Sequence, residues 1–538
     1  MRKVPLLAPA LCALLVAAPR GGELHLCLRG DPKSLDPLMV TDEPSEVIRY
    51  LTSGVLLRLN RRTQQIEPEL ASAWKVDDAG RRITFRLRPN VRFSDGTPFD
   101  AADVEYTLKR LADPVLAPPA GEVFRTAAKI QRFRRPNPLE ISLEFAAPVS
   151  ALELLFDEVP LLSSRSPVKE KAVLGPFRLA QYRRGVSLRL ERNPNYWKLD
   201  SSATRLPYLD AIVLEIQLNR DIELTRFRRG ELQLISNLDA DNFDRLRRQA
   251  PGEAVDAGAS LESEMLWFNQ STAAPIAEYR KAWFRSQAFR RAISEAISRK
   301  DIVRLVFRGL AVEASGPFSP AAKFWYNSRL SPPEQDTDSA RRRLAAGGFR
   351  WRDGYLLDPG GRAVEFSLIT NSGNRNRARI AALVQEDLAK LGVKVNVTAL
   401  DFPALIERLN HTHDYEACLL SLSGIDLDPN DQMNVWLSSS SHHPWNPRQA
   451  KPATPWEADI DRLMREQAAS YDPQVRRGAI GRLQEIVREQ APVIFLVHPH
   501  ALMAVGSAVH GLEPSSLKPR LLWNAERLYL EQPVAGKR

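Results

Sequence analysis

The sequence predicts an α/β fold made of more than one domain. The chain has 538 residues, which exceeds the roughly 250 residues at which a single core usually stops growing. Its composition, 44% hydrophobic and 26% charged, is that of an ordinary soluble globular protein. Strand-like and helix-like patterns alternate between residues 364 and 422, which favours parallel strands joined by helices.

The N-terminus resembles a secretory signal. Arg2 and Lys3 precede an apolar stretch from Val4 to Ala18, and we assign residues 1–22 to a signal peptide with cleavage near Gly21 or Gly22. The apolar stretch is short for a spanning helix, although an uncleaved anchor is the alternative. We therefore expect an exported protein, in the periplasm or at the extracytoplasmic face of the cell membrane.

Charge and cysteine content argue against a nucleic-acid partner and against a framework of disulfide bonds. The formal net charge is +10, but the basic residues are scattered and diluted by 65 acidic ones, so we expect a solvated basic surface and no nucleic-acid partner. Cys27 and Cys418 are the cysteines outside the signal, which is too few for a disulfide framework. We expect no cofactor.

Local patterns predict the first elements. Residues 23–28 and 82–88 alternate apolar and polar side chains, as half-buried strands do. Asp100 has the position of an N-cap with Asp103 three residues later, so a helix should follow. Its apolar face is formed by Val104, Leu108 and Leu111.

Two further regions have clear patterns. A helix is predicted over Phe289 to Ile297, and Ser298 should cap another turn that closes near Gly309. The alternating region then comprises strands at 364–370, 393–397 and 415–422, and helices at 377–391 and 402–409. In open parallel sheets ligands bind beyond the carboxyl ends of the strands. The loops that follow the first and last of these strands supply the candidate ligand-binding residues Asn371, Ser372 and Arg375, and Gly424, Ile425, Asp426 and Asp428.

One motif is specific enough to indicate a protein family. Residues 93–104, Phe-Ser-Asp-Gly-Thr-Pro-Phe-Asp-Ala-Ala-Asp-Val, closely resemble the family 5 extracytoplasmic solute-binding proteins, the oligopeptide- and dipeptide-binding proteins of ABC importers. Matching stretches recur in order at 35–37, 70–74, 175–177, 193–197, 268–269 and 289–293. The resemblance covers essentially the whole mature chain.

The resemblance implies a periplasmic-binding-protein-like fold with mixed sheets, a cleft between two lobes and an extra subdomain. Lobe I would comprise residues 23–60, an extra subdomain at 61–170, residues 171–266 and a return at 495–538, with lobe II at 267–494. It implies no enzymatic activity. A monomer would capture peptides or peptide-like solutes by hinge closure and deliver them to ABC permease and ATPase subunits. Membrane contact would occur only through the permease or an uncleaved signal.

The resemblance leaves the solute open. Peptide binders of the family hold the ligand ammonium group with an aspartate in a loop ending in Asp-Pro, but Ile425 has that position here and Asp426 replaces it only if the loop shifts by one residue. A blocked peptide, a sugar or a metal chelate therefore stays open, as does a sensor or chaperone role. Asp428 either contacts ligand or caps a turn. Trp436 and Asn269 either line the cleft or belong to the core.

Other chemistry lacks support in the sequence. His411, His413 and Asp414 are close together, but their spacing is not that of a zinc hydrolase. Nucleophile-elbow, phosphate-loop and dinucleotide motifs do not occur. We expect neither a metal site nor an enzyme.

Overall fold

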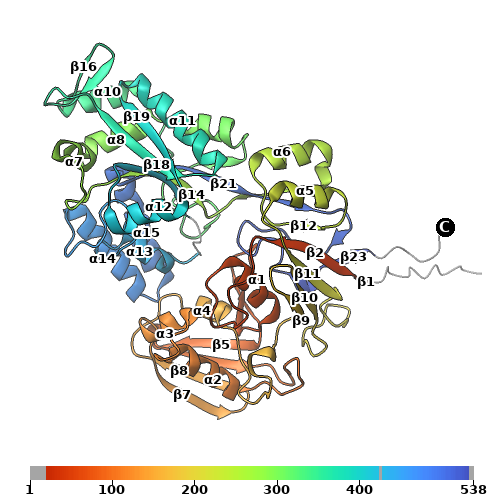
Figure 1. The fold of residues 1–538 in the computed structure, drawn as a ribbon. Coiled ribbons are helices and arrows are strands. Elements are labelled where there is room, and N and C mark those ends of the chain that lie inside the picture. Colours follow the sequence, from red (N-terminus) through yellow and green to blue (C-terminus); the bar gives the residue numbers. More distant parts are fainter. Residues whose placement is uncertain (1–19, 423–426, 532–538) are drawn as a thin grey trace, which may run out of the picture.

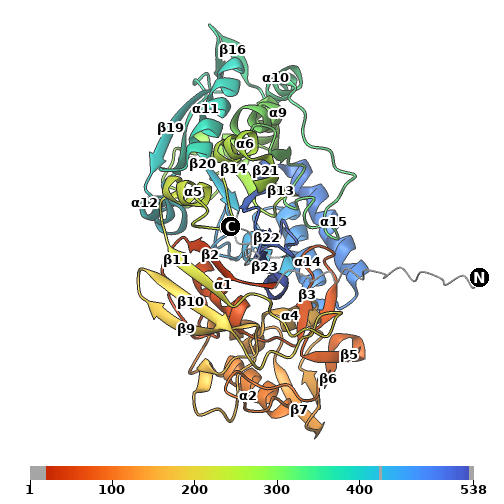
Figure 2. The same ribbon diagram turned by 90° about the vertical axis from the view of Figure 1, so that its right-hand side faces the viewer.

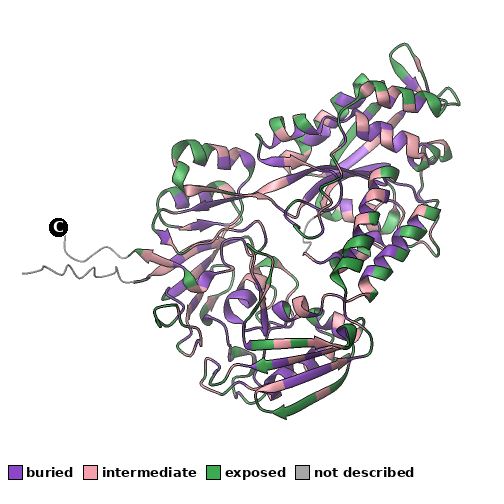
Figure 3. Ribbon diagram, turned by 180° about the vertical axis from the view of Figure 1, so that it is seen from behind, coloured by how far each residue is buried: buried purple, intermediate pink, exposed green. Residues whose placement is uncertain are grey.

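The computed structural model describes residues 20–422 and 427–531. It shows the predicted α/β fold, divided into two lobes with a smaller sheet at the far end of one of them (Figure 1). The central strands of both lobes are largely buried, whereas several edge strands and the outer faces of the helices are exposed (Figure 3). Among the helices of the described ranges, none is long and apolar enough to cross a membrane.

Lobe I is built on a mixed sheet with the strand order β12-β2-β11-β10-β9. The predicted strand at residues 23–28 is confirmed as β2, with Leu24, Leu26 and Leu28 on its buried face. β2 pairs in parallel with β11 and β12, and the remaining pairs are antiparallel. The elements are β2 (Glu23–Leu28), β9 (Phe177–Arg183), β10 (Ser187–Arg192), β11 (Ala211–Ile216), β12 (Leu234–Ile235), α1 (Glu43–Thr52), α5 (Arg220–Arg228) and α6 (Ala240–Gln249).

A four-stranded subdomain extends from lobe I (Figure 2). Its antiparallel strands lie in the order β5-β6-β8-β7, and helix α2 packs against them over a separate core. Both local predictions are confirmed, because β6 covers the predicted strand and Asp100 and Asp103 form a reciprocal capping box. The elements are β5 (Ala71–Asp77), β6 (Arg82–Leu87), β7 (Ile130–Asn137), β8 (Glu140–Phe145), α2 (Ala101–Ala112) and α4 (Leu152–Glu158).

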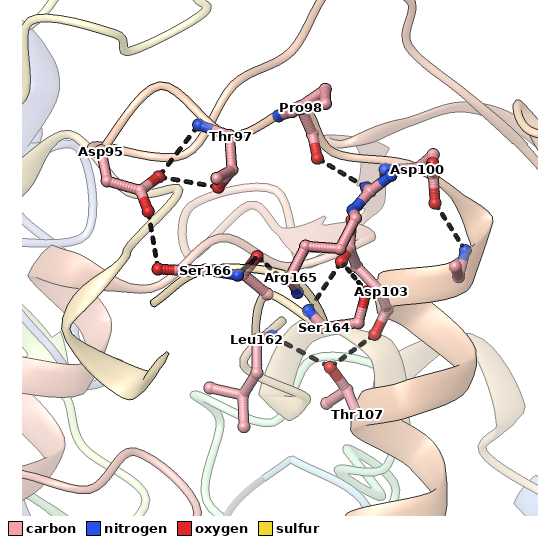
Figure 4. Close-up of polar contacts among 12 residues, drawn as sticks. Asp95, Thr97, Pro98, Asp100, Asp103, Thr107, Leu162, Ser164, Arg165 and Ser166 are labelled. Carbon is pink, nitrogen blue, oxygen red and sulfur yellow. Dashed lines mark hydrogen bonds and ion pairs between the residues drawn. The ribbon is translucent and has the colours of Figure 1, made fainter. Parts of the chain in front are cut away.

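The motif at residues 93–104 has a structural role in this subdomain (Figure 4). Asp103 is fully buried, and its carboxylate accepts hydrogen bonds from the backbone N–H and hydroxyl of Ser164, at 2.8 and 2.7 Å, and from Arg165 at 2.9 Å. Asp95 accepts one from Ser166 at 2.6 Å. The motif thus ties the start of α2 to the segment at 164–166, and it explains the fold rather than a ligand.

Lobe II confirms the predicted alternation of strands and helices. β18 pairs in parallel with both β19 and β20, and β14 joins antiparallel to β20. Helix α11 begins at Arg375, two residues earlier than predicted, because the Asn374 side chain caps it by accepting from the N–H of Arg377 at 3.1 Å. The elements are β14 (Ser263–Phe268), β18 (Glu365–Asn371), β19 (Lys394–Leu400), β20 (Ala417–Leu422), α8 (Gln287–Ala296), α11 (Arg375–Lys390), α12 (Phe402–Glu407), α14 (Pro455–Ala469) and α15 (Pro473–Gln490).

Two chain segments cross between the lobes. The long strand β21 (Val493–Val505) pairs with β14 and β15 (Ala311–Glu313) through its first half and with β13 (Ala254–Ala259) and β12 through its second. Residues 260–262 make the other crossing, between β13 and β14. The predicted lobe limits at 266 and 494 fall inside β14 and β21, whereas β21 changes its pairing partner from β15 to β13 near Pro499.

The N-terminal prediction falls partly on described residues. Residues 1–19 of the predicted signal peptide lie outside them. β1 (Arg20–Gly21) pairs with β23 (Tyr529–Glu531), and the N–H of Gly22 donates to Asp210 Oδ2 at 2.9 Å. The last three residues of the predicted signal are therefore part of lobe I in this structure.

Candidate functional site

A cavity of about 500 Å³ lies against the crossing segment at 260–262. A volume of this size suits a small solute. Lobe I supplies most of its wall, through α1, residues 236–237 and the segment at 516–522, while Leu427 contributes from lobe II. Because the wall comes from both lobes and from the connection between them, any change in the interlobe angle reshapes the cavity.

Charged side chains of both signs line the cavity. The acidic ones are Glu43, Glu46, Glu158 and Glu262, and the basic ones are Arg49, Arg61, Lys518 and Arg520. Between them lie apolar side chains such as Val40, Val47, Leu59, Leu261 and Leu427. Such a lining suits a solute that has both charged and apolar parts.

Two buried ionisable side chains, His498 and Glu264, lie in or next to the crossing segments. His498 of β21 is fully buried with Nδ1 3.0 Å from the Ser263 hydroxyl, and burial lowers its pKa to about 4. Glu264 of β14 is also buried, and it pairs with Arg377 at 2.9 Å, although burial still raises the pKa of its carboxyl. These contacts fasten the first turn of α11 and the crossing strands to one another.

The lobes also contact each other away from the crossing strands. Asp241 on α6 of lobe I pairs with Arg308 and Arg379 of lobe II, at 2.5 and 2.8 Å. On another side, Lys323 Nζ of lobe II donates to the carbonyl of Arg62 at 2.8 Å. The structure therefore represents a form in which the lobes touch.

A third interlobe contact involves the four-stranded subdomain. The Ser150 hydroxyl accepts from Asn430 Nδ2 at 2.8 Å, and the Ser150 carbonyl accepts from Arg476 at 3.1 Å. Tyr471 of lobe II donates to Glu153 of α4 at 2.6 Å. The subdomain thus rests on the helical side of lobe II.

None of the six predicted ligand-binding residues that the structure describes lines this cavity. Ser372 and Arg375 are exposed at the start of α11, and Asn371 is half-buried and accepts from Arg377 at 2.6 Å. Gly424, Ile425 and Asp426 lie outside the described residues. The next residue, Leu427, lines the cavity, whereas Asp428 pairs with Arg476.

Three of the predicted residues have structural roles. Asn269 is fully buried and its amide donates to the carbonyls of His413 and Tyr415, at 2.9 and 3.0 Å. Trp436 is 1% exposed in the core of lobe II, which favours the core alternative for this residue. Asp428 caps the short helix that follows it and pairs with Arg476 at 2.6 Å, which favours the capping alternative.

The residues that line the cavity were not among the candidates predicted from the sequence. Its walls come from segments that are hundreds of residues apart, and no periodic pattern connects them. One signal was present: Arg520 directly precedes the apolar run from Leu521 to Trp523, where a charged side chain is unusual. Within residues 20–422 and 427–531, no group of three or more His, Cys, Asp or Glu side chains could hold a metal ion.

Comparison with known proteins agrees with this architecture. The family model described as bacterial extracellular solute-binding proteins, family 5 middle, matches residues 65–443. The oligopeptide-binding protein AppA of Bacillus subtilis is 24% identical over 531 residues, covering 95% of this chain and 92% of AppA. Di/tripeptide-binding protein 2 of Pseudomonas aeruginosa is 24% identical over 545 residues, covering 96% of each chain.

A solved structure shows the same fold. NikA from Brucella suis, determined in complex with Fe(III)-EDTA, superposes with a TM-score of 0.78 at 19% identity, covering 94% of this chain and 99% of NikA. Two lobes joined by crossing strands, with a cavity beside the crossing, are the architecture of the periplasmic-binding-protein-like fold. By the family match over residues 65–443, this chain belongs to the bacterial extracellular solute-binding proteins of family 5.

Proposed function

We propose that this protein captures peptides or peptide-like solutes between its lobes, outside the cytoplasm, and delivers them to the permease of an ABC importer. The observation that carries the proposal is the position of the cavity, against the crossing segment at 260–262 and with Leu427 of lobe II in its wall. A solute that contacts both lobes stabilises the form in which they touch, and that form docks on the permease.

The mixed lining supports a peptide-like solute. Peptides combine charged termini with apolar side chains, and the cavity has charged side chains of both signs beside leucine and valine. Two relatives with nearly full coverage are named as peptide-binding proteins. The binding of Fe(III)-EDTA by NikA, on the same fold, makes a metal chelate the second candidate solute.

Native mass spectrometry of the purified protein tests the solute directly. We expect retained peptides that are released unchanged when the complex is denatured. A retained metal chelate, or a peptide that is recovered cleaved, would contradict the proposal. Small-angle scattering with and without a mixture of short peptides should show a smaller radius of gyration in their presence, because the bound solute stabilises the contacting form.

A substitution in the lobe II wall tests the position of the site. Leu427→Asp places an additional negative charge in the cavity and should weaken peptide binding about tenfold or more, since the charge must be desolvated when the lobes close. Leu218→Asp is the matched control, because Leu218 is 66% exposed on lobe I and does not line the cavity. Equal affinities of the two variants would place the solute elsewhere.

A further inference from the structure

The outer face of the four-stranded subdomain bears charged side chains that the fold only partly neutralises. The alternate residues of β6 and β8, such as Ile83 and Leu143, are fully buried in the core shared with α2. The other residues of these strands therefore point away from the core. Across β7, β8 and β6 they form two rows, Arg132, Glu144 and Arg82 in the first, and Arg134, Ser142 and Thr84 in the second.

A hollow of about 490 Å³ lies over these two rows. Small side chains, Thr84 and Ser142, stand beside the long side chains of Arg82 and Arg134 in its lining, so the space between the arginines is not filled. None of the residues that line this hollow lines the interlobe cavity. The hollow is therefore separate from the candidate solute site.

Three guanidinium groups share one carboxylate at the hollow. Arg134 Nε is 3.0 Å from Glu144, but the Nε atoms of Arg82 and Arg132 are 3.6 and 3.8 Å from the same carboxylate, beyond a good hydrogen bond. Nε of Arg82 has no hydrogen-bond partner among the described residues. Three positive charges against one negative charge leave an excess of two, and two of the guanidinium groups keep donors to offer.

The remaining charged side chains of the hollow are balanced by other neighbours. Arg135 pairs with Glu105 of α2 at 2.6 Å. Glu140 stands directly opposite Arg86 in the register of β8 and β6, so these two charges offset each other. The excess of positive charge beside Glu144 therefore remains.

A hydroxyl donor lies at the floor of the hollow. The hydroxyls of Thr84 and Ser142 are 3.0 Å apart and share one hydrogen bond. Because each hydroxyl has one hydrogen, one of the two O–H groups is left to donate elsewhere. Ser142 is 9% exposed, so this donor belongs to the sheet itself and does not move with a long side chain.

We propose that this hollow binds a phosphate group, carried either by a soluble molecule or by a phospholipid headgroup. Arg82 and Arg132 are 43% and 61% exposed, and their guanidinium groups can each donate a pair of hydrogen bonds to phosphate oxygens. The hydroxyl pair supplies a further donor from below. A phosphate group offers more acceptor oxygens than a carboxylate, which suits donors that approach from three directions. The inference is independent of the proposed solute capture.

Phosphorus-31 NMR tests the hollow with inorganic phosphate as the probe. At constant ionic strength the wild-type protein should broaden the phosphate resonance, and the double variant Arg82→Gln, Arg132→Gln should bind about tenfold or more weakly, because hydrogen bonds between charged groups are lost. The matched control is the double variant Arg184→Gln, Arg352→Gln, which removes the same charge at positions that are 90% and 79% exposed and do not line the hollow. Equal losses in the two double variants would mean that phosphate binds to diffuse surface charge, and would overturn the site.

Two single substitutions separate a defined site from general positive charge. Ser142→Ala keeps every charge but changes the hydroxyl donors, so phosphate should bind a few-fold more weakly. Glu144→Gln removes the competing carboxylate and should strengthen phosphate binding a few-fold. Wild-type affinity in both variants, each shown to be folded by circular dichroism, would contradict the assignment.

Vesicles identify the source of the phosphate group. Cosedimentation would compare vesicles of phosphatidylglycerol mixed with phosphatidylcholine against vesicles of phosphatidylcholine alone. If a headgroup is the ligand, the double variant Arg82→Gln, Arg132→Gln should bind the anionic vesicles about 10- to 30-fold more weakly than the wild type, as expected for two basic side chains at an anionic surface. Binding of inorganic phosphate without binding of vesicles assigns the hollow to a soluble molecule. If the wild type binds neither, the inference is wrong, and peptide capture in the interlobe cavity is unaffected.

Discussion

Buried arginines make more hydrogen bonds within the protein in the core of lobe II than in the wall of the interlobe cavity. In the core, Arg290 is 1% exposed and donates from Nη1 and Nη2 to backbone carbonyls at 2.8 and 2.9 Å, while Arg299 is equally saturated by Phe495 and Ser294 at 2.9 Å. In the cavity, Arg520 has a free Nε among the described residues and long contacts elsewhere. The two core arginines therefore have more of their N–H groups hydrogen-bonded within the protein than Arg520 has.

Burial lowers the pKa of all three arginines, so the difference between them lies in their hydrogen-bond partners. Burial lowers the pKa of Arg290 to about 10 and that of Arg299 to about 9, and neither has a carboxylate within hydrogen-bonding reach among the described residues. Both guanidinium groups instead hold carbonyls, and those of Gln490 and Ala491 are at the carboxyl end of α15. Burial also lowers the pKa of Arg520. Core arginines are thus part of the backbone hydrogen-bond network, and the cavity arginine is not.

The largest expected effect comes from removing the core arginine. Arg290→Met keeps the volume but leaves the carbonyls at the end of α15 without donors, so the free energy of unfolding should fall by about 3 kcal/mol or more. Arg520→Met should change it by less than about 1 kcal/mol, because replacing a poorly paired buried charge by an apolar group is often neutral or stabilising.

Urea denaturation of the ligand-free protein measures both variants under the same conditions. A loss of stability in Arg520→Met as large as that in Arg290→Met would mean that the cavity arginine is also structural. The contrast between the two regions would then disappear.

The buried histidine of the crossing strand β21 should make the free energy of unfolding depend on pH. Burial lowers the pKa of His498 to about 4, whereas an unfolded histidine titrates near 6.5. Above pH 6.5 the imidazole is neutral in both states and contributes nothing. Between pH 6.5 and 4 only the unfolded chain takes up the proton, so the free energy of unfolding should fall by about 3 kcal/mol over that window.

His498→Gln should flatten this part of the pH profile, whatever its effect on absolute stability. His411→Gln, at an exposed position, is the matched control and should keep the wild-type slope. Urea unfolding at a series of pH values gives the slopes. A profile in His498→Gln as steep as that of the wild type would show that the crossing opens readily to water.

The sequence predicts the core of this molecule far better than its site. Capping residues and apolar periodicity are local, so helix α2 and the strand, helix and strand order around β18 are confirmed close to their predicted limits. The cavity depends on distant segments that meet only after folding, so Arg520 and Glu262 carry no shared pattern. Whether Trp436 faces the solute or the core likewise depends on which side chains pack against it. In the structure it lies in the core.

The ion pair between the lobes should have a moderate effect. Asp241 contacts Arg308 and Arg379 from across the interface, but all three side chains are between 31% and 46% exposed, so water screens the pair. Asp241→Asn should favour the open form of the ligand-free protein by up to about 1 kcal/mol, seen as a larger radius of gyration by small-angle scattering. Asp353→Asn, at an 84% exposed position in lobe II, should leave the radius unchanged. An unchanged radius in Asp241→Asn would show that this pair does not hold the lobes together.

The contact between the subdomain and lobe II should matter least. Tyr471 donates one hydrogen bond to Glu153 at 2.6 Å, and Tyr471→Phe removes the hydroxyl without changing the packing of the ring. Because water can replace the lost donor at this partly exposed site, we expect opening to be favoured by only about 0.5–1 kcal/mol. The matched control is Tyr355→Phe, whose ring is 57% exposed on lobe II. Scattering curves of the two variants should therefore be almost the same. A clear expansion in Tyr471→Phe alone would mean that the subdomain, and not the crossing strands with Asp241, sets the angle between the lobes.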